Sequence, residues 1–144
     1  MVVTEVIEVP RPVEESFAYV ADFSTVAEWD PGIHSSRRVS GDCGVGAVYE
    51  VQAEFRAKTM PFIYTVTAYE ENRSIVLDGV GEKATSLDTI AFEATADGGT
   101  RITYTADFRL KGVLRLAEPF LGGTFNGLAR EALAGLEAKL GAAR

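Results

Sequence analysis

The side chain best placed for chemistry is a carboxylate, Asp88, in a stretch where apolar and polar residues alternate. Asp88 has the same parity as Ile90 and Phe92, so a regular strand directs all three toward the apolar side of a sheet. Burial there raises the pKa of a carboxyl group toward the range of a general acid or base. In the alternative interpretation, Asp88 lies at the wet start of its strand and binds backbone or a basic neighbour. Asp88 is the candidate catalytic residue, and both interpretations are open.

Three tyrosines, Tyr49, Tyr64 and Tyr104, occupy apolar positions of three further alternating stretches. A buried phenol needs a hydrogen-bond partner, and phenols that converge on one apolar space could hold the oxygen atoms of an aromatic ligand. The simpler interpretation makes each a core tyrosine whose hydroxyl reaches the rim. Trp29, the only tryptophan, has the same two interpretations, as a core residue or as a ligand contact.

The chain lacks the residues that other catalytic sites and most metal sites require. His34 is the only imidazole and Cys43 the only thiol, which excludes a Cys/His zinc cage and an internal disulfide. No serine stands in a nucleophile elbow, and the glycines of residues 41–46 precede a strand, whereas a dinucleotide motif opens a helix. Only a carboxylate metal site stays formally open, and we expect neither a metal nor a cofactor.

Composition narrows the class of partner. The 144 residues include 14 basic and 21 acidic side chains, a net charge of -7, which disfavours nucleic acids and anionic membrane surfaces. No uncharged stretch approaches the roughly 20 apolar residues that cross a bilayer. Residues 1–9 lack the basic start of a signal peptide. We therefore expect a cytoplasmic chain with one domain, residues 1–144, and no membrane span.

The hydrophobic period changes twice along the chain. Residues 2–9 alternate as a strand, and residues 13–23 and 25–29 have the spacing of two short helices, the second capped by Ser24. Six further strands are predicted over residues 35–40, 47–57, 62–69, 74–80, 86–96 and 100–110. Turns are predicted at residues 41–44, 71–73, 79–83 and 97–99. Residues 113–140 return to helical spacing, and glycines at 122, 123 and 127 favour a kink or a looser first segment.

This order of elements resembles the START-like or SRPBCC superfamily, also described as Bet v 1-like. Residues 6–22 are similar to the opening strand and helix of that family, and residues 98–104 to the hairpin into its last strand. The segment Trp29-Asp30-Pro31-Gly32-Ile33 is similar to its second-helix tryptophan. The polyketide cyclase/dehydrase and lipid-transport branch is the most similar. The resemblance implies an α+β helix-grip fold, in which a curved antiparallel sheet of about seven strands wraps around a long C-terminal helix and two short helices follow the first strand.

The resemblance also implies an apolar cavity between the sheet and the C-terminal helix. The leading hypothesis is that a monomer or homodimer binds or transports a small hydrophobic molecule there, such as a lipid, an isoprenoid or an aromatic polyketide. The alternative is a cyclase/dehydratase-type enzyme in which a carboxylate or tyrosine of the same cavity moves a proton. The residues expected to contact the ligand are Trp29, Tyr49, Val51, Phe55, Phe62, Tyr64, Ile90, Phe92, Tyr104, Phe108, Leu121, Phe125 and Leu128.

Several basic residues fall near strand ends at one side of this expected cavity. They are Arg56, Lys58, Arg109, Lys111 and Arg115. Two interpretations are open: a basic mouth around the cavity, or single solvated charges on an acidic surface.

Overall fold

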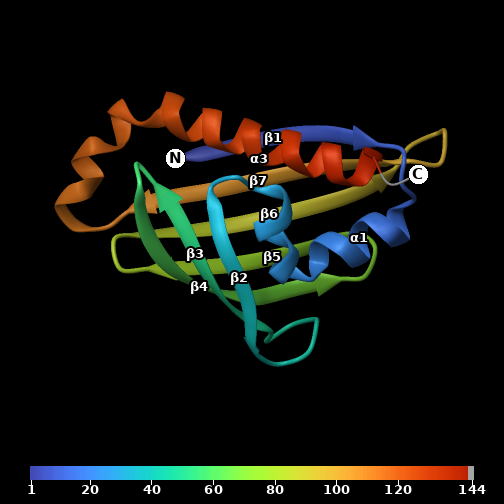
Figure 1. The fold of residues 1–144 in the computed structure, drawn as a ribbon, viewed down its shortest axis with the longest axis horizontal. Coiled ribbons are helices and arrows are strands. Elements are labelled where there is room, and N and C mark those ends of the chain that lie inside the picture. Colours follow the sequence, from blue (N-terminus) through green and yellow to red (C-terminus); the bar gives the residue numbers. More distant parts are fainter. Residues whose placement is uncertain (143–144) are drawn as a thin grey trace.

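The computed structural model describes residues 1–142. Its sheet is a meander of six antiparallel strands, and the first strand of the chain pairs with the last of them at one edge (Figure 1). The order across the sheet is β1-β7-β6-β5-β4-β3-β2. The strand bounds are β1 Val2–Val9, β2 Ile33–Ser40, β3 Val48–Phe55, β4 Lys58–Glu70, β5 Ser74–Gly81, β6 Ala84–Ala94 and β7 Thr100–Leu110. Because antiparallel pairing keeps parity, the apolar faces of all these strands meet on one side.

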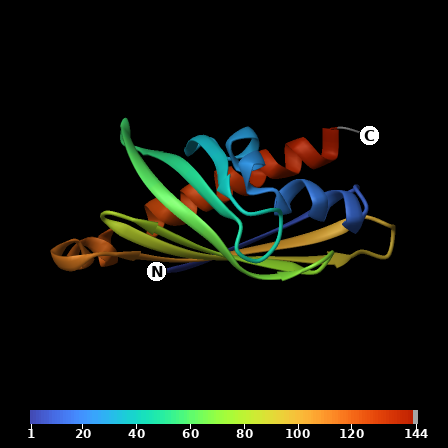
Figure 2. The ribbon, with the colours of Figure 1, turned by 90° about the horizontal axis from the view of Figure 1, so that it is seen from below.

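The helices lie on the concave side of the sheet. Helix α1, a 3-10 turn η1 and helix α2 follow β1 at one end of the molecule, and helix α3 runs along the concavity (Figure 2). Their bounds are α1 Val13–Ala21, η1 Phe23–Thr25, α2 Val26–Trp29, and α3 Gly122–Ala142 after a 3-10 segment, η2 Gly112–Phe120. This arrangement confirms the predicted helix-grip fold.

Helix α3 packs unevenly along its length. Its second half buries Ala132, Leu133, Leu136 and Leu140, while Phe125 and its neighbours in the first half are only partly buried. The nearest backbone neighbours of α3 are β1 and α2. At Gly135 the approach to α2 is so close that a Cβ would lie 1.9 Å from the Trp29 carbonyl oxygen. The closed core is therefore concentrated at the C-terminal end of α3.

The helical region predicted over residues 113–140, with a kink or a looser first segment, is divided into two elements. Residues 112–120 form the 3-10 segment η2, and the α-helix begins only at Gly122. Pro119 explains the interruption, because a proline inside an α-helix lacks a donor and clashes with the preceding turn. Leu114, in this segment, is 41% exposed.

Other boundaries differ locally. Ser24 does not cap α2; Asp22 accepts hydrogen bonds from the Ser24 backbone N–H at 3.2 Å and hydroxyl at 2.6 Å. Strand β4 begins at Lys58, since a two-residue turn at Arg56 and Ala57 joins it to β3.

The predicted turn at residues 79–83 is shorter than expected, because β5 runs to Gly81. A Cβ at Gly79 would lie 2.5 Å from the Tyr64 ring, and one at Gly81 would lie 3.0 Å from the Phe62 ring. These glycines are therefore strand residues that make room for aromatic rings of β4.

Candidate functional site

Asp88 lies in the middle of the sheet and is buried. Strand β6 begins at Ala84, so Asp88 is an interior strand residue opposite Ala106 of β7, and only 4% of it is exposed. The interpretation that it sits at a wet strand start is therefore wrong. The Ser86 hydroxyl donates to Asp88 Oδ1 at 2.5 Å, and the Tyr104 hydroxyl donates to Asp88 Oδ2. The carboxylate is held by two hydroxyls from its own and the neighbouring strand.

Burial dominates the protonation equilibria of this group. It raises the pKa of Asp88 to about 6, although the hydrogen bonds from Ser86 and Tyr104 act in the opposite direction. Burial and the Asp88 charge raise the pKa of both Tyr64 and Tyr104 well above the usual value for a phenol. At neutral pH the phenols are hydrogen-bond donors, and Asp88 is poised to gain or lose a proton.

A second carboxylate, Asp30, belongs to the same electrostatic environment. It follows α2 directly, and its Oδ1 accepts the Gly32 backbone N–H at 2.8 Å. Burial raises its pKa to about 6, and the charges of Asp88 and Glu131 act in the same direction. Asp30 lies in a loop, where no alternation could have marked it as a site residue. We call Asp30, Tyr64, Asp88 and Tyr104 the acid–phenol cluster.

The Trp29 indole borders this cluster, and its N–H group is the polar part of the side chain. Its ring meets Tyr104 edge-on at a centroid distance of 6.2 Å, and 3% of the residue is exposed. No acceptor among the described residues lies within hydrogen-bond distance of Trp29 Nε1. A buried N–H without an acceptor costs about 1–3 kcal/mol, so an acceptor from outside the chain would be bound favourably.

Partly buried aromatic rings contact one another where the first half of α3 meets the sheet. Phe125 of α3 stacks on Phe55 of β3 at 6.0 Å and contacts Phe108 of β7 at 4.4 Å. All three keep some solvent exposure, as do Leu121 and Leu128 of the same helix. We call Phe55, Phe108 and Phe125 the aromatic mouth, because these partly exposed rings meet where the first half of α3 faces the sheet.

The remaining candidate contacts are buried, and some belong to the closed core. Phe92 packs edge-on against Phe17 of α1 at 5.1 Å, and Tyr49 packs against Phe23 at 6.0 Å. These rings therefore pack against α1 and η1. The buried candidates nearer the cluster are Trp29, Val51, Phe62, Tyr64 and Ile90. Ile90 lies opposite Tyr104 in the pairing of β6 with β7.

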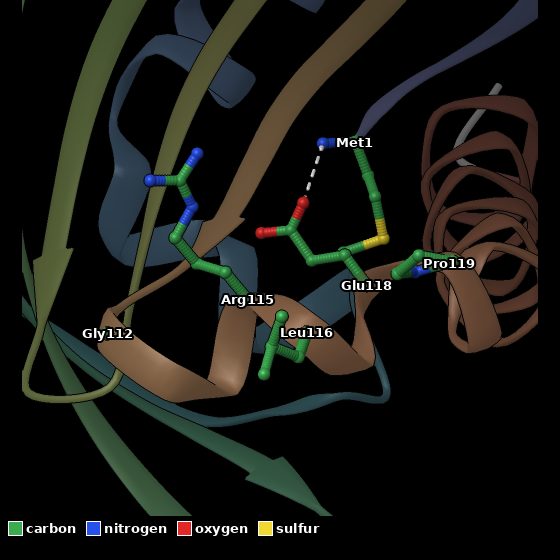
Figure 3. A pocket seen from close by; sticks show the side chains of 6 residues that line it. All are labelled: Met1, Gly112, Arg115, Leu116, Glu118 and Pro119. Carbon is green, nitrogen blue, oxygen red and sulfur yellow. Dashed lines mark ion pairs between the residues drawn. The ribbon is translucent and has the colours of Figure 1, made fainter.

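One surface depression was not expected from the sequence. It has a volume of about 670 Å³ and lies between the start of β1 and η2 (Figure 3). Its lining consists of Met1, Gly112, Arg115, Leu116, Glu118 and Pro119. This depression opens to solvent, whereas Tyr64 and Asp88 of the acid–phenol cluster are buried.

The residues considered for other chemistries stay apart from the cluster. His34 and Cys43 are exposed, and Cys43 Sγ lies 3.1 Å from an Arg38 guanidinium nitrogen. Within residues 1–142, no group of three His, Cys, Asp or Glu side chains is arranged to hold a metal ion. In the same part of the chain, no helix has the length and apolar character needed to span a bilayer.

Comparison with known proteins agrees with this geometry. The family model described as "Polyketide cyclase / dehydrase and lipid transport" matches residues 1–141. A search of curated proteins finds no matching sequence.

Solved structures share the fold at low sequence identity. The Zhui aromatase/cyclase from a Streptomyces species is 12% identical with a TM-score of 0.83, over 97% of this chain and 93% of the other. A protein from Thermus thermophilus, TTHA0849, is 16% identical with a TM-score of 0.83, over 97% of each chain. A START superfamily protein from Mycobacterium smegmatis is 18% identical with a TM-score of 0.77, over 96% of each chain. At these identities the likeness shows the fold and leaves the ligand undefined.

Proposed function

Since the chain belongs to the polyketide cyclase/dehydrase and lipid-transport family, we propose that it binds a small, mostly apolar molecule that carries an oxygen acceptor. The ligand lies between α3 and the sheet, with its apolar body at the aromatic mouth and its oxygen at the acid–phenol cluster. The observation that carries this proposal is the buried Trp29 Nε1 beside Tyr104, for which the described residues supply no acceptor. A ligand hydroxyl suits this position, because it accepts from the indole and can donate to a carboxylate.

The apolar part of the proposal rests on the uneven packing of α3. The second half of α3 has fully buried leucines, whereas the first half places the partly buried Phe125 against Phe55 and Phe108 of the sheet. Small-molecule sites combine such apolar walls with a few convergent polar groups. The distribution of polar and apolar groups therefore predicts an amphipathic ligand with one polar end.

Matched ligand pairs test the proposal. We expect isoprenoid alcohols or polyphenols to stabilise the protein in a thermal-shift panel more than hydrocarbons of the same shape. Trp29→Phe should weaken alcohol binding about tenfold, the effect of one lost hydrogen bond, and leave hydrocarbon binding nearly unchanged. Tyr69→Phe is the control, since Tyr69 is a partly buried tyrosine that packs against Phe17 of α1. Equal affinity of the native protein for both members of each pair would contradict the proposal.

A cyclase/dehydratase activity is the second candidate, and the state of Asp88 favours it. A carboxylate with a pKa of about 6 can accept a proton from a carbon beside a carbonyl group. It can return that proton to the alkoxide formed when this carbon attacks a second carbonyl, so Asp88 ends unchanged. Asp88→Asn should then abolish turnover of an oligoketide substrate while ligand affinity stays within about twofold. Retained turnover would reject this candidate and leave the binding proposal intact.

A further inference from the structure

The 3-10 segment η2 presents an unusual set of exposed apolar side chains. Val113 is 83% exposed, Leu116 79% and Phe120 85%, which makes them the three most exposed large apolar residues described. They recur at spacings of three and four residues on a segment that buries none of its side chains. Exposed apolar clusters of this kind mark interaction surfaces.

Basic side chains lie within and next to this segment and in two turns at the same end of the fold. The stretches 54–58, 82–83 and 107–118 contain six basic and four acidic residues, a net charge of +2, so the rest of the chain carries -9. Two of the four acids are engaged internally: Asp107 pairs with Arg109 at 3.2 Å, and Glu118 accepts the Leu110 backbone N–H at 2.9 Å. Within the described residues, Lys58 and Arg115 form no ion pair. The local charge is opposite in sign to that of the whole molecule.

These stretches gather at one end of the fold. Figures 1 and 2 both place η2, the turn between β3 and β4 and the turn between β5 and β6 at the same end. Lys111 connects two of them, because its backbone N–H donates to the Lys83 carbonyl and its Nζ to the Gly81 carbonyl at 2.7 Å. The aromatic mouth lies at this end too, since Phe55 directly precedes one turn and α3 follows η2.

We propose that η2 and its basic surroundings form a docking surface for an anionic phospholipid bilayer. Phe120, Leu116 and Val113 insert among the acyl chains, and Arg115, Lys58 and the neighbouring cations meet the lipid phosphates. Apolar side chains flanked by Lys and Arg are the pattern of interfacial membrane binding. The net charge of the whole chain disfavours such membranes, and the charge distribution reverses that expectation for this end alone.

Charge argues against a second copy of the chain as the occupant. A two-fold symmetric contact would place the same surface on both partners, so the basic groups around one η2 would face those around the other. The -9 carried by the rest of the molecule instead orients this end toward an anionic membrane and the remainder away from it.

Vesicle binding tests the proposal directly. We expect the native protein to bind vesicles of phosphatidylcholine with about one third phosphatidylglycerol at least tenfold more strongly than vesicles of phosphatidylcholine alone. About 0.5 M salt should weaken that binding. Leu116→Ser combined with Phe120→Ser should reduce it tenfold or more, and Arg115→Gln combined with Lys58→Gln should remove the preference for anionic lipid. Val45→Ser is the control, because Val45 is 69% exposed in the loop between β2 and β3.

Fluorescence locates the contact. The only native tryptophan is buried, so Phe120→Trp adds a reporter on η2 over a steady background. We expect its emission to shift to the blue with anionic vesicles and to be quenched by brominated lipid, whereas Val45→Trp should show neither effect. Equal responses from the two reporters, or unchanged binding by the serine variants, would overturn the proposal.

Self-association is the competing outcome. Self-association of the native chain that is lost in the double serine variant, without vesicle binding, would also overturn the proposal and identify a second copy as the occupant. The Trp29-dependent binding of soluble alcohols is measured without vesicles. Failure of membrane docking is therefore distinguishable from failure of the proposed ligand site.

Discussion

Asp88 shows how two neighbouring strands set the protonation of one side chain. Ser86 is two residues away on the same face of β6, and Tyr104 comes from the adjacent strand β7. These hydroxyls stabilise the charged form, but burial outweighs them and raises the pKa of Asp88 to about 6. The native protein therefore holds a proton on Asp88 at pH values where the unfolded chain has already released it.

The first prediction concerns pH and stability at this residue. The native pKa exceeds the ordinary value of 3.8, so the native state binds more protons than the unfolded state between about pH 4 and pH 6. The contribution of Asp88 to the free energy of unfolding falls as pH rises through this window, by roughly 3 kcal/mol in total. Asp88→Asn removes this dependence, so its stability relative to the native protein should increase from pH 4 to pH 7 in urea unfolding.

Controls separate Asp88 from the other carboxylates. The pKa of Asp30 is also raised to about 6, so Asp30 too lowers the free energy of unfolding as pH rises. Asp30 is present in both the native and the Asp88→Asn proteins, so its contribution cancels in their difference. Tyr19→Phe is a matched surface control, since the Tyr19 hydroxyl bonds Glu28 on the exposed side of the helices. A difference between the native and Asp88→Asn proteins that stays constant with pH would contradict a proton held on Asp88.

At the scale of elements, the contact between α2 and α3 fixes the position of Trp29. Gly135 of α3 has no side chain, so the backbone of α3 can approach the Trp29 carbonyl oxygen of α2 closely. The indole is thereby held against Tyr104, and residues 1–142 give its N–H no polar partner. A glycine within α3 thus positions a residue of the proposed ligand site.

The second prediction compares two glycines of α3. Gly135→Ala would place a Cβ 1.9 Å from a backbone oxygen, so the helices must separate, and we expect a loss of more than about 2 kcal/mol in the free energy of unfolding. Gly127→Ala meets no atom within 4 Å and should stabilise by up to about 1 kcal/mol through helix propensity. Urea unfolding of both variants measures the contrast. Similar effects at the two positions would mean that α2 and α3 do not approach as described.

At the scale of the whole molecule, the fold has a closed end and a loosely packed end. Leu136 and Leu140 are fully buried near α1 and α2, whereas Phe125 is partly exposed between Phe55 and Phe108. The proposed ligand enters at the loosely packed end, where η2 also lies. One part of α3 therefore stabilises the fold, and another part lies where the ligand is proposed to enter.

The third prediction follows from this division. Leu136→Ala empties part of the closed core and should lower the free energy of unfolding by about 2–5 kcal/mol. Phe125→Ala opens the aromatic mouth, and we expect a smaller loss of stability together with faster ligand dissociation, by roughly tenfold. Stopped-flow exchange of a bound fluorescent alcohol, paired with urea unfolding, checks both. An unchanged dissociation rate in Phe125→Ala would show that the ligand leaves by another route.

Periodic patterns in the sequence predict which side of a strand or helix a residue occupies. They do not predict residues in loops or contacts between elements. Alternation placed Asp88 and Tyr104 on one side of the sheet, because antiparallel pairing carries parity from strand to strand. It could not place Asp30, which lies in a loop. Nor could it show that the Trp29 N–H has no acceptor within the described part of the chain, because that depends on distances between elements. The 3-10 segment had a readable signal in Pro119, but its apolar spacing resembles that of α3. The exposure of η2 depends on how the elements pack together, and the spacing of apolar residues does not predict it.

The divided packing of α3 also bears on how relatives of this chain can diversify. Residues 121–130 line the loosely packed end, and residues 132–140 seal the core, so mutation of the first stretch spares the contacts that hold the fold. Natural selection can then alter ligand preference without crossing the threshold of foldability. A combinatorial library confined to positions 121, 125 and 128 should accordingly yield mostly folded variants with changed ligand profiles, whereas one at 133, 136 and 140 should yield mostly unfolded ones.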